Sequence, residues 1–413
     1  MVPAEHIVFV DPFSSTQFLA ENLKAASIKT SVVYTMRPVS GYVKQRPELF
    51  DDCFYLDSLD GISALAQELI EAKVTKIYYG SEHSVTIADQ LAKQICPQWA
   101  NDEATSLCRS DKYVMQEALK SAGLPSIKNM KIPRTLTQED ENQLRDWTFP
   151  VVVKPINHGG AYGVMVCHTI EQVKEAVSAQ PALGQFYDYA SDFFVLQEYL
   201  SGEEYFIDTF SHQGNHWVSG IQRYQRQLTN GRPISRYAEV IDPLSPIAKT
   251  CIDYVLNVLS AVGMREGFAH TEVMLTPDGP RLIEVNPRVS GAHGSSNKLF
   301  QYCGFPSQVE LLIAACQNKL MPKITSSAGY YGRKVYLQNQ REEYQLRSLN
   351  VELLQTLPSF AEALMLQSPG AKVTLPTTLM DTIALVSLVN KDQQQLERDY
   401  QQVIQWESAE QLF

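Results

Sequence analysis

The sequence predicts a mixed fold, in which an α/β unit at the N-terminus is followed by α+β units. Three observations favour this class: strands and helices alternate up to about residue 107, a clear β-hairpin lies between residues 268 and 288, and the chain has 413 residues. Single hydrophobic cores stop growing at roughly 250 to 300 residues. We therefore expect two or three domains.

The first unit reads as a parallel sheet of about four strands. The expected strands are residues 6–10, 30–35, 50–57 and 76–80, and the expected helices between and after them are residues 16–26, 61–73 and 85–95. The first turn lacks a G-x-G-x-x-G pattern, so a dinucleotide is not expected there.

Glu82 follows the fourth strand, at the carboxyl end where ligands of open α/β sheets usually bind. It is therefore a candidate substrate residue. The alternative is a helix N-terminus capped by Ser81 or Ser84, with Glu82 as an acid in its first turn.

Two lysines stand at element ends in the next segment. Lys112 lies in the first turn of a helix that ends at Gly123, where the helix dipole disfavours a cation, so it needs solvent or an anion. Lys154 ends a strand that begins near Phe149. The loop 157–163 follows, and its glycines Gly159, Gly160 and Gly163 permit close approach to phosphates or simply form a hairpin turn. It is not a Walker A loop, because G-K-[ST] is absent.

A strand at 193–200 contains Gln197, Glu198 and Leu200, and its turn offers backbone groups to a flat heterocycle. Glu204, just beyond, can accept hydrogen bonds from ribose hydroxyls. Asp208 can do the same or can be an outward-facing strand residue.

Positive charge then gathers between residues 221 and 240. The arginines there are Arg223, Arg226, Arg232 and Arg236. They suit a carboxylate or phosphate, with a solvated loop as the alternative. A helix is expected over 245–264.

The hairpin of residues 268–288 is the candidate metal site. Residues two apart on a strand point the same way, so Glu272, Glu284 and Asn286 can converge on one face. Oxygen ligands without Cys or His donors suit Mg²⁺. Arg288, on the same side, adds a positive group for handling phosphate. The alternative is an exposed hairpin with ordinary surface carboxylates.

After the hairpin, residues 290–298 read as a small-residue loop and 305–319 as a helix. The tail is expected to contain strands at 329–338 and 382–390 and a helix at 392–406, with a packing or lid role.

The composition constrains partners and compartment. A net charge of −11 argues against nucleic acid or an anionic membrane as the main partner. The sequence shows neither a signal-peptide pattern nor an apolar run of about 18 residues, so we expect a cytoplasmic protein. Seven scattered cysteines without a C-x-x-C pair are expected to be buried thiols rather than disulfides or zinc ligands.

The ordered set of Lys112, Lys154 with its glycine loop, the 197–200 strand end, Glu204 and the Glu272 to Arg288 hairpin resembles the ATP-grasp superfamily, over roughly residues 108–315. The resemblance implies a Rossmann-like pre-ATP-grasp domain at 1–107, a central subdomain at 108–195, and a C-terminal subdomain at 196–413 with an extension from about residue 330. The nucleotide would bind between the two α+β subdomains.

The resemblance also implies roles for these residues. Lys112, Lys154 and the glycines of the loop would bind the phosphates of ATP. Glu198 and Leu200 would bind adenine through their backbones, with Gln197 standing where Glu is frequent in the family. Glu272, Glu284 and Asn286 would hold two Mg²⁺ ions, for which Mn²⁺ can substitute. Arg288 and Lys154 would be catalytic.

Within the superfamily, the stretches GSEHSVTIADQLA and CRSDKYVMQEALKSAGLP are similar to carboxylate–amine ligases that join amino acids, including the L-amino acid ligases and the dapdiamide synthetase type. This similarity implies an acyl phosphate intermediate, small amino acid or peptide-like substrates, dipeptide or peptide-antibiotic synthesis, and a homodimer. An ATP-grasp carboxylase, a purine-pathway ligase and a non-catalytic nucleotide-binding protein are the alternatives.

The substrate pocket is expected beside the loop after Arg288. Its candidate residues, with Glu82 and Arg236, are Ser290, Gly291 and His293. A small Ala292 would leave room for a bulky side chain. His270 and His293 are candidates for the general base.

Overall fold

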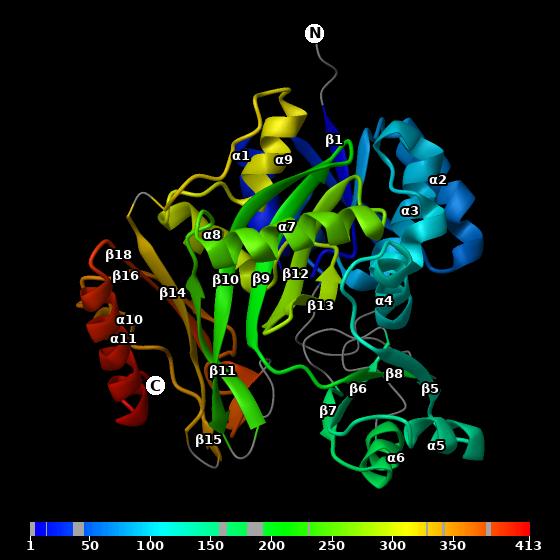
Figure 1. The fold of residues 1–413 in the computed structure, drawn as a ribbon. Coiled ribbons are helices and arrows are strands. Elements are labelled where there is room, and N and C mark those ends of the chain that lie inside the picture. Colours follow the sequence, from blue (N-terminus) through cyan, green and yellow to red (C-terminus); the bar gives the residue numbers. More distant parts are fainter. Residues whose placement is uncertain are drawn as a thin grey trace.

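The computed structural model describes residues 5–13, 15–35, 45–156, 163–179, 193–229, 232–327, 329–340, 343–376 and 381–413. Three sheets account for most of its strands, and Figure 1 shows how they are arranged. Within the described residues, no helix is long and apolar enough to cross a membrane. All seven cysteines are free, and five of them are buried.

The N-terminal unit is the predicted parallel sheet, with strand order β3-β2-β1-β4. Its elements are β1 (His6–Val10), α1 (Thr16–Ala25), β2 (Lys29–Tyr34), β3 (Asp52–Tyr55), α2 (Ile62–Glu71), β4 (Lys76–Tyr79) and α3 (Val85–Ile95). All five residues of β1 are buried, because helices cover both faces of a central parallel strand.

The second unit is a small antiparallel sheet, with order β5-β8-β6-β7. After α4 (Lys112–Ser121), it contains β5 (Asn129–Pro133), α5 (Gln138–Leu144), β6 (Val151–Pro155), β7 (Met165–Cys167), α6 (Ile170–Ser178) and β8 (Phe193–Glu198). It extends away from the rest of the molecule at the lower right of Figure 1. Strand β8 lies wholly in this sheet, so the boundary expected at residue 195 falls inside a strand.

The third unit is an eight-stranded sheet with order β13-β12-β9-β10-β11-β14-β18-β16. Its strands are β9 (Glu203–His212), β10 (Asn215–Thr229), β11 (Arg232–Val240), β12 (Gly267–Thr276), β13 (Gly279–Asn286), β14 (Tyr331–Leu337), β16 (Phe360–Met365) and β18 (Ala384–Asn390). Its helices are α7 (Pro246–Ala261), α8 (Ser295–Tyr302), α9 (Gln308–Cys316), α10 (Val351–Leu354) and α11 (Gln393–Ser408). A separate two-stranded sheet is formed by β15 (Glu343–Gln345) and β17 (Lys372–Thr374).

The two faces of this large sheet have different roles. Tyr205 and Ile207 of β9 pack with α7 in one apolar core. Their neighbours Glu204, Phe206 and Asp208 point to the opposite face, because side chains alternate along a strand. That second face carries the candidate site.

Several expectations needed correction. The arginine-rich stretch is not a loop, because residues 222–229 of β10 pair with residues 232–240 of β11. The expected loop at 290–298 contains the start of helix α8. The tail has the predicted strands β14 and β18 and the helix α11, and they join the same sheet as the hairpin β12–β13.

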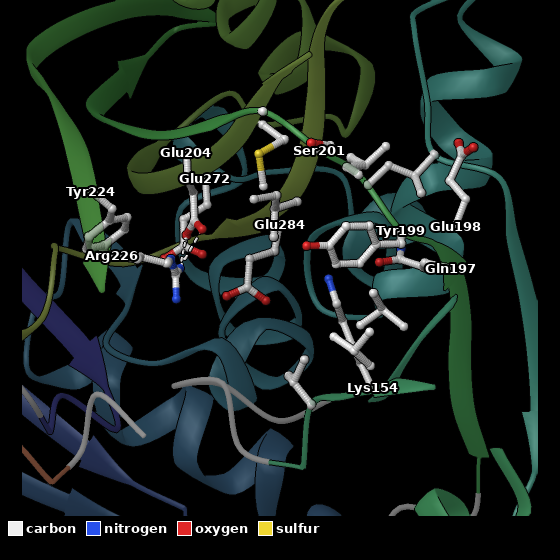
Figure 2. Close-up of a pocket in the computed structure, with 18 of the residues that line it drawn as sticks. Lys154, Gln197, Glu198, Tyr199, Ser201, Glu204, Tyr224, Arg226, Glu272 and Glu284 are labelled. Atoms are coloured by element: carbon white, nitrogen blue, oxygen red, sulfur yellow. Dashed lines mark hydrogen bonds and ion pairs between the residues drawn. The ribbon is translucent and has the colours of Figure 1, made fainter. Parts of the chain in front are cut away.

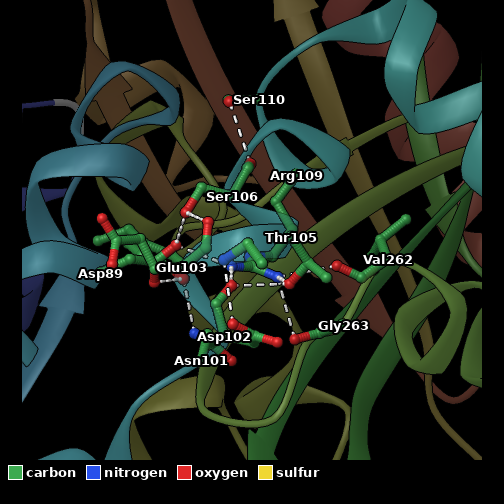
Figure 3. A network of polar contacts seen from close by, with 12 residues as sticks. Asp89, Asn101, Asp102, Glu103, Thr105, Ser106, Arg109, Ser110, Val262 and Gly263 are labelled. Carbon is green, nitrogen blue, oxygen red and sulfur yellow. Dashed lines mark hydrogen bonds and ion pairs between the residues drawn. The ribbon is translucent and has the colours of Figure 1, made fainter. Parts of the chain in front are cut away.

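A buried polar network joins the N-terminal unit to the large sheet (Figure 3). Arg109 is fully buried, and it donates to Asp89 of α3 at 2.7 Å and to the carbonyl of Val262 at 2.8 Å. Asn101 donates to the carbonyl of Glu266 at 2.9 Å, just before β12. These contacts fix the strand that carries Glu272 relative to the first unit.

Candidate active site

A cavity of about 530 Å³ lies between the small sheet and the large sheet. Its lining includes Lys112 from α4, Lys154 from β6, Val164 and Val166 near β7, Gln197 and Glu198 from β8, Tyr199, Leu200, Ser201 and Gly202 from the connection, and Glu204, Tyr224, Arg226, Glu272 and Glu284 from the large sheet. Figure 2 shows charged side chains from both sheets around this space. The structure therefore brings together most of the residues that the sequence singled out.

Glu272 and Glu284 face each other across the hairpin β12–β13. His270 and Asn286 form the next pair on the same face, and the Asn286 amide donates to Glu284 at 3.1 Å. The expected convergence of Glu272, Glu284 and Asn286 on one face is thus confirmed.

The donor set fits a hard divalent cation, since it consists of two carboxylates and an amide oxygen. In the described residues, no group of three or more His, Cys, Asp or Glu side chains forms a cluster that could hold a metal ion. An ion here would need most of its ligands from phosphate and water, as Mg²⁺ usually does in nucleotide sites.

Lys112, a cation in the first turn of α4, has a carboxylate as its partner. The Asp111 side chain caps α4 by accepting from the N–H groups of Tyr113 and Val114, and the Lys112 ammonium lies 2.9 Å from Glu284. An anion thus accompanies this cation at the helix N-terminus. Burial disfavours the charged form of Glu284, but the neighbouring Lys112 ammonium favours it more strongly. The pKa of this carboxyl is therefore lowered.

Lys154 is the second cation of the cavity. Burial lowers the pKa of Lys154, and Glu284 partly opposes this shift by favouring the charged form. A partly buried ammonium in a polar cavity gains from an additional anion, which makes Lys154 suited to bind a phosphate group. Gly163, with φ +67°, follows on the far side of the loop, whereas Gly159 and Gly160 lie outside the described residues.

The connection between the two sheets consists of residues 199–202. Gln197, just before it, is only 1% exposed, and both atoms of its amide lack a hydrogen-bond partner although they border the cavity. Buried amides are normally hydrogen-bonded, so this side chain is suited to a polar ligand. The N–H of Glu198 donates to the carbonyl of Lys128 at 3.1 Å, which anchors the end of β8 to the segment before β5. Gly202 allows close approach to β12, because a Cβ there would lie 2.2 Å from the carbonyl oxygen of Leu275.

The arginines of β10 and β11 do not act as one group. Arg226 pairs with Glu204 inside the cavity, while Arg223 pairs with Glu203 and Glu239. Arg236, an expected substrate residue, instead lies buried in an ion pair with Glu407 of α11. The side chain of Arg232 lies outside the described residues.

Arg288 and Glu82 form an ion pair next to the hairpin, with Arg288 Nε 2.7 Å and Nη2 2.5 Å from the same carboxylate oxygen. The alternative expected for Glu82 is confirmed, because it lies in the first turn of a short helical segment in which Ser84 donates to the carbonyl of Ser81. Its role as a substrate residue stays a prediction. Glu82 orients the arginine.

Asp208 and His270 are paired beneath the carboxylates. Asp208 is fully buried and its carboxylate is 2.6 Å from His270 Nδ1, so it is neither a cavity-lining ribose ligand nor an outward residue. Burial opposes the charge on His270, but Asp208 and Glu272 outweigh it and raise its pKa to about 9. A histidine that is already protonated cannot accept a proton from an amine, so His270 is a poor general base.

The loop after Arg288 has an unusual backbone. Ala292, His293 and Gly294 all have positive φ, at 54°, 55° and 75°. A Cβ on Gly294 would lie 2.4 Å from the ring of Phe18, so only glycine fits there. Ser290 is buried and its carbonyl accepts from Ser15 at 2.6 Å, which gives this residue a structural role. Gly291 precedes the turn, and burial lowers the pKa of His293.

Comparison with known proteins agrees with this architecture. Residues 147–297 match the model of the ATP-grasp domain. An L-amino acid ligase from Bacillus licheniformis has a similar structure, with a TM-score of 0.76 and 18% identity over 97% of each chain. An N5-carboxyaminoimidazole ribonucleotide synthetase in complex with ADP gives a TM-score of 0.70 and 16% identity over 99% of each chain.

The fold and the cavity therefore define the class: this chain contains an ATP-grasp domain and has the ATP-grasp fold over its full length. The resemblance expected from its segments is confirmed. Within this class it is related to dapdiamide A synthase from Enterobacter agglomerans, with 30% identity over 261 residues, which are 62% of this chain and 59% of that protein. The match thus spans less than two thirds of that relative.

Proposed function

We propose that this protein is an ATP-dependent ligase that activates the carboxylate of an amino acid and couples it to an amine. The observation that carries the proposal is the cavity itself, whose lining contains the carboxylates Glu272 and Glu284 together with the phosphate-binding candidates Lys112 and Lys154. The relationship to dapdiamide A synthase and to L-amino acid ligase supports amino acids as substrates.

ATP would lie with its adenine at the connection and its phosphates toward the hairpin. The partnerless amide of Gln197 would bind the adenine amino group, assisted by the carbonyl of Glu198 and the N–H of Leu200. Glu204, held by Arg226, would accept from the ribose hydroxyls. Lys154, Lys112 and the glycines of the loop would neutralise the phosphates.

Glu272, Glu284 and Asn286 would hold two Mg²⁺ ions, or Mn²⁺ as a substitute, and the metal would supply charge neutralisation on the transferring phosphoryl group. The substrate carboxylate oxygen forms a bond to the γ-phosphorus as the bond to ADP breaks. The amine nitrogen then attacks the acyl carbon, the bond to phosphate breaks, and the amine loses a proton. Arg288, oriented by Glu82, would stabilise the oxyanion of this second step.

The test is to supply the purified protein with Mg²⁺, ATP and pairs of amino acids, and to measure ADP, phosphate and product mass. We expect ADP and phosphate together with a dipeptide or related amide, the type of product expected in dipeptide or peptide-antibiotic synthesis. AMP and pyrophosphate would exclude the acyl phosphate route, and turnover that requires bicarbonate would instead indicate a carboxylase.

A further inference from the structure

Lys334 of β14 is a buried lysine that the proposed mechanism does not use. It is 4% exposed, and its ammonium donates to the hydroxyl of Ser296 on α8 at 2.6 Å. The ammonium also lies 5.5 Å from the ring of Phe206 and 5.7 Å from that of Tyr336. Burial lowers the pKa of Lys334 to about 8, with Asp208 acting against this effect.

The surroundings of Lys334 differ from those of the other buried cations on these strands. Arg333 has Glu397 at 2.8 Å, and Arg236 pairs with Glu407. For Lys334, whose ammonium donates to the hydroxyl of Ser296, no carboxylate among the described residues lies within the ion-pair distance of 4.0 Å. Burial of a cation without a paired anion is costly, so such a lysine is suited to bind an anion from outside the chain.

Partnerless polar groups occur on the same side of the sheet. One carboxylate oxygen of Asp208, the amide of Gln222 and the hydroxyl of Ser295 are buried and have no hydrogen-bond partner within the described part of the chain. Gln222 lies opposite Phe206 in the β9–β10 pairing, and Ser295 is adjacent to Ser296. These groups match a ligand that carries both donors and acceptors.

Aromatic and aliphatic side chains lie between the surroundings of Lys334 and the nucleotide cavity. One apolar cluster contains Phe206, Tyr336 and the partly buried Tyr224 and Ala292. It also includes Leu364 of β16 and Leu366, which follows this strand. Tyr224 lines the cavity itself, and its ring centroid is 4.8 Å from that of Phe206. The rings of Phe206 and Tyr224 therefore lie between Lys334 and the ATP cavity.

We infer that Lys334 binds the carboxylate of the acceptor amino acid, the substrate that supplies the amine, while Tyr336 and its apolar neighbours contact that substrate's side chain. The carboxylate of the donor must reach the γ-phosphate, and Lys334 is not among the residues that line the nucleotide cavity. The acceptor carboxylate is not consumed and can stay bound to a fixed cation. This inference rests on the proposed function, and it makes the acceptor a free α-amino acid rather than a simple amine.

The experiment compares Lys334→Met with the wild type, using acceptors that have a free carboxylate and the same acceptors as carboxamides. We expect the KM for the free amino acid to rise by roughly tenfold to a hundredfold in the variant, the usual effect of losing a charge-assisted hydrogen bond. The KM values for ATP and for the carboxamide should not change. Lys372→Met is the matched control, because Lys372 pairs with Glu343 on the surface of the same C-terminal region, with 70% of its side chain exposed.

The outcomes separate the two proposals. Absence of amino-acid-dependent ADP release in the wild type would refute the proposed function. Wild-type activity with equal KM changes for both acceptors, or with no change, would overturn the role of Lys334 alone. Thermal unfolding of Lys334→Met shows whether the variant is folded, and Lys334→Arg should restore part of the affinity for the free carboxylate.

Discussion

Glu82 and Arg288 form an ion pair between the loop after β4 and the segment after β13, two places 206 residues apart. The pair connects the N-terminal unit directly to the segment that follows the hairpin β12–β13. Burial disfavours the charged form of Glu82, but Arg288 outweighs burial and lowers the pKa of Glu82 to about 2.

Replacement of Glu82 by Gln should therefore change the dependence of stability on pH. The folded pKa lies below the unfolded one, so the ionised carboxylate contributes stability above about pH 4.5, and this contribution is lost as the pH falls toward 2. Urea unfolding should show a stability difference between wild type and Glu82→Gln that shrinks with acidification. A constant difference would contradict the assigned pKa. Turnover of the variant should fall with little change in the KM for ATP.

Replacement of Glu284 by Gln tests the metal site. This change keeps the size of the side chain but removes the charge that faces Glu272 and Lys112. ADP release should fall by about a hundredfold or more, because charge stabilisation by a metal contributes several kcal/mol. Glu175→Gln, on the exposed face of α6, is the matched control and should behave as wild type. Unchanged ADP release from Glu284→Gln would refute the metal assignment.

Replacement of Gln197 by Leu should have opposite effects on stability and on nucleotide binding. Without nucleotide, the partnerless amide destabilises the fold, so its removal should raise the free energy of unfolding by about 1 kcal/mol or more. The KM for ATP should increase, since the adenine contact is lost. Tyr78→Phe removes another buried partnerless polar group, on β4 and not among the residues that line the cavity, and should raise stability without any change in this KM. Equal KM values in both variants would argue against adenine at Gln197.

Replacement of Arg109 by Met should destabilise the junction of Figure 3. The change leaves Asp89 buried without its cation, a loss of roughly 3–5 kcal/mol by equilibrium unfolding. Arg398→Met, in which the arginine is exposed on α11, should stay within about 0.5 kcal/mol of wild type. A similar small change in both variants would show that the network contributes little.

The sequence predicted the local elements well because their signals are local. The apolar strand 6–10 and the turn of the hairpin β12–β13 are encoded in adjacent residues. The pairing of Glu272 with Glu284 also depends on a register shift between Glu272 and Val273, which strand alternation alone does not indicate. The helix α8 was missed because its Ser-Ser-Asn start has weak helix propensity and is stabilised by packing.

The long-range partners could not be predicted. Nothing near Arg236 in the sequence indicates Glu407, and nothing near Lys334 indicates Ser296 or Phe206. These contacts depend on strand order in the large sheet, in which β14 follows β11 although some ninety residues separate them.

The shared sheet also restricts how this chain can be shortened or fused. Strands β14, β18 and β16 complete the edge of the sheet that carries the hairpin β12–β13. A truncated version that ends near residue 330 would leave β11 with an open row of backbone N–H and C=O groups, which is a template for aggregation. Expression tags and partner domains should therefore not take the place of the C-terminal strands or of α11.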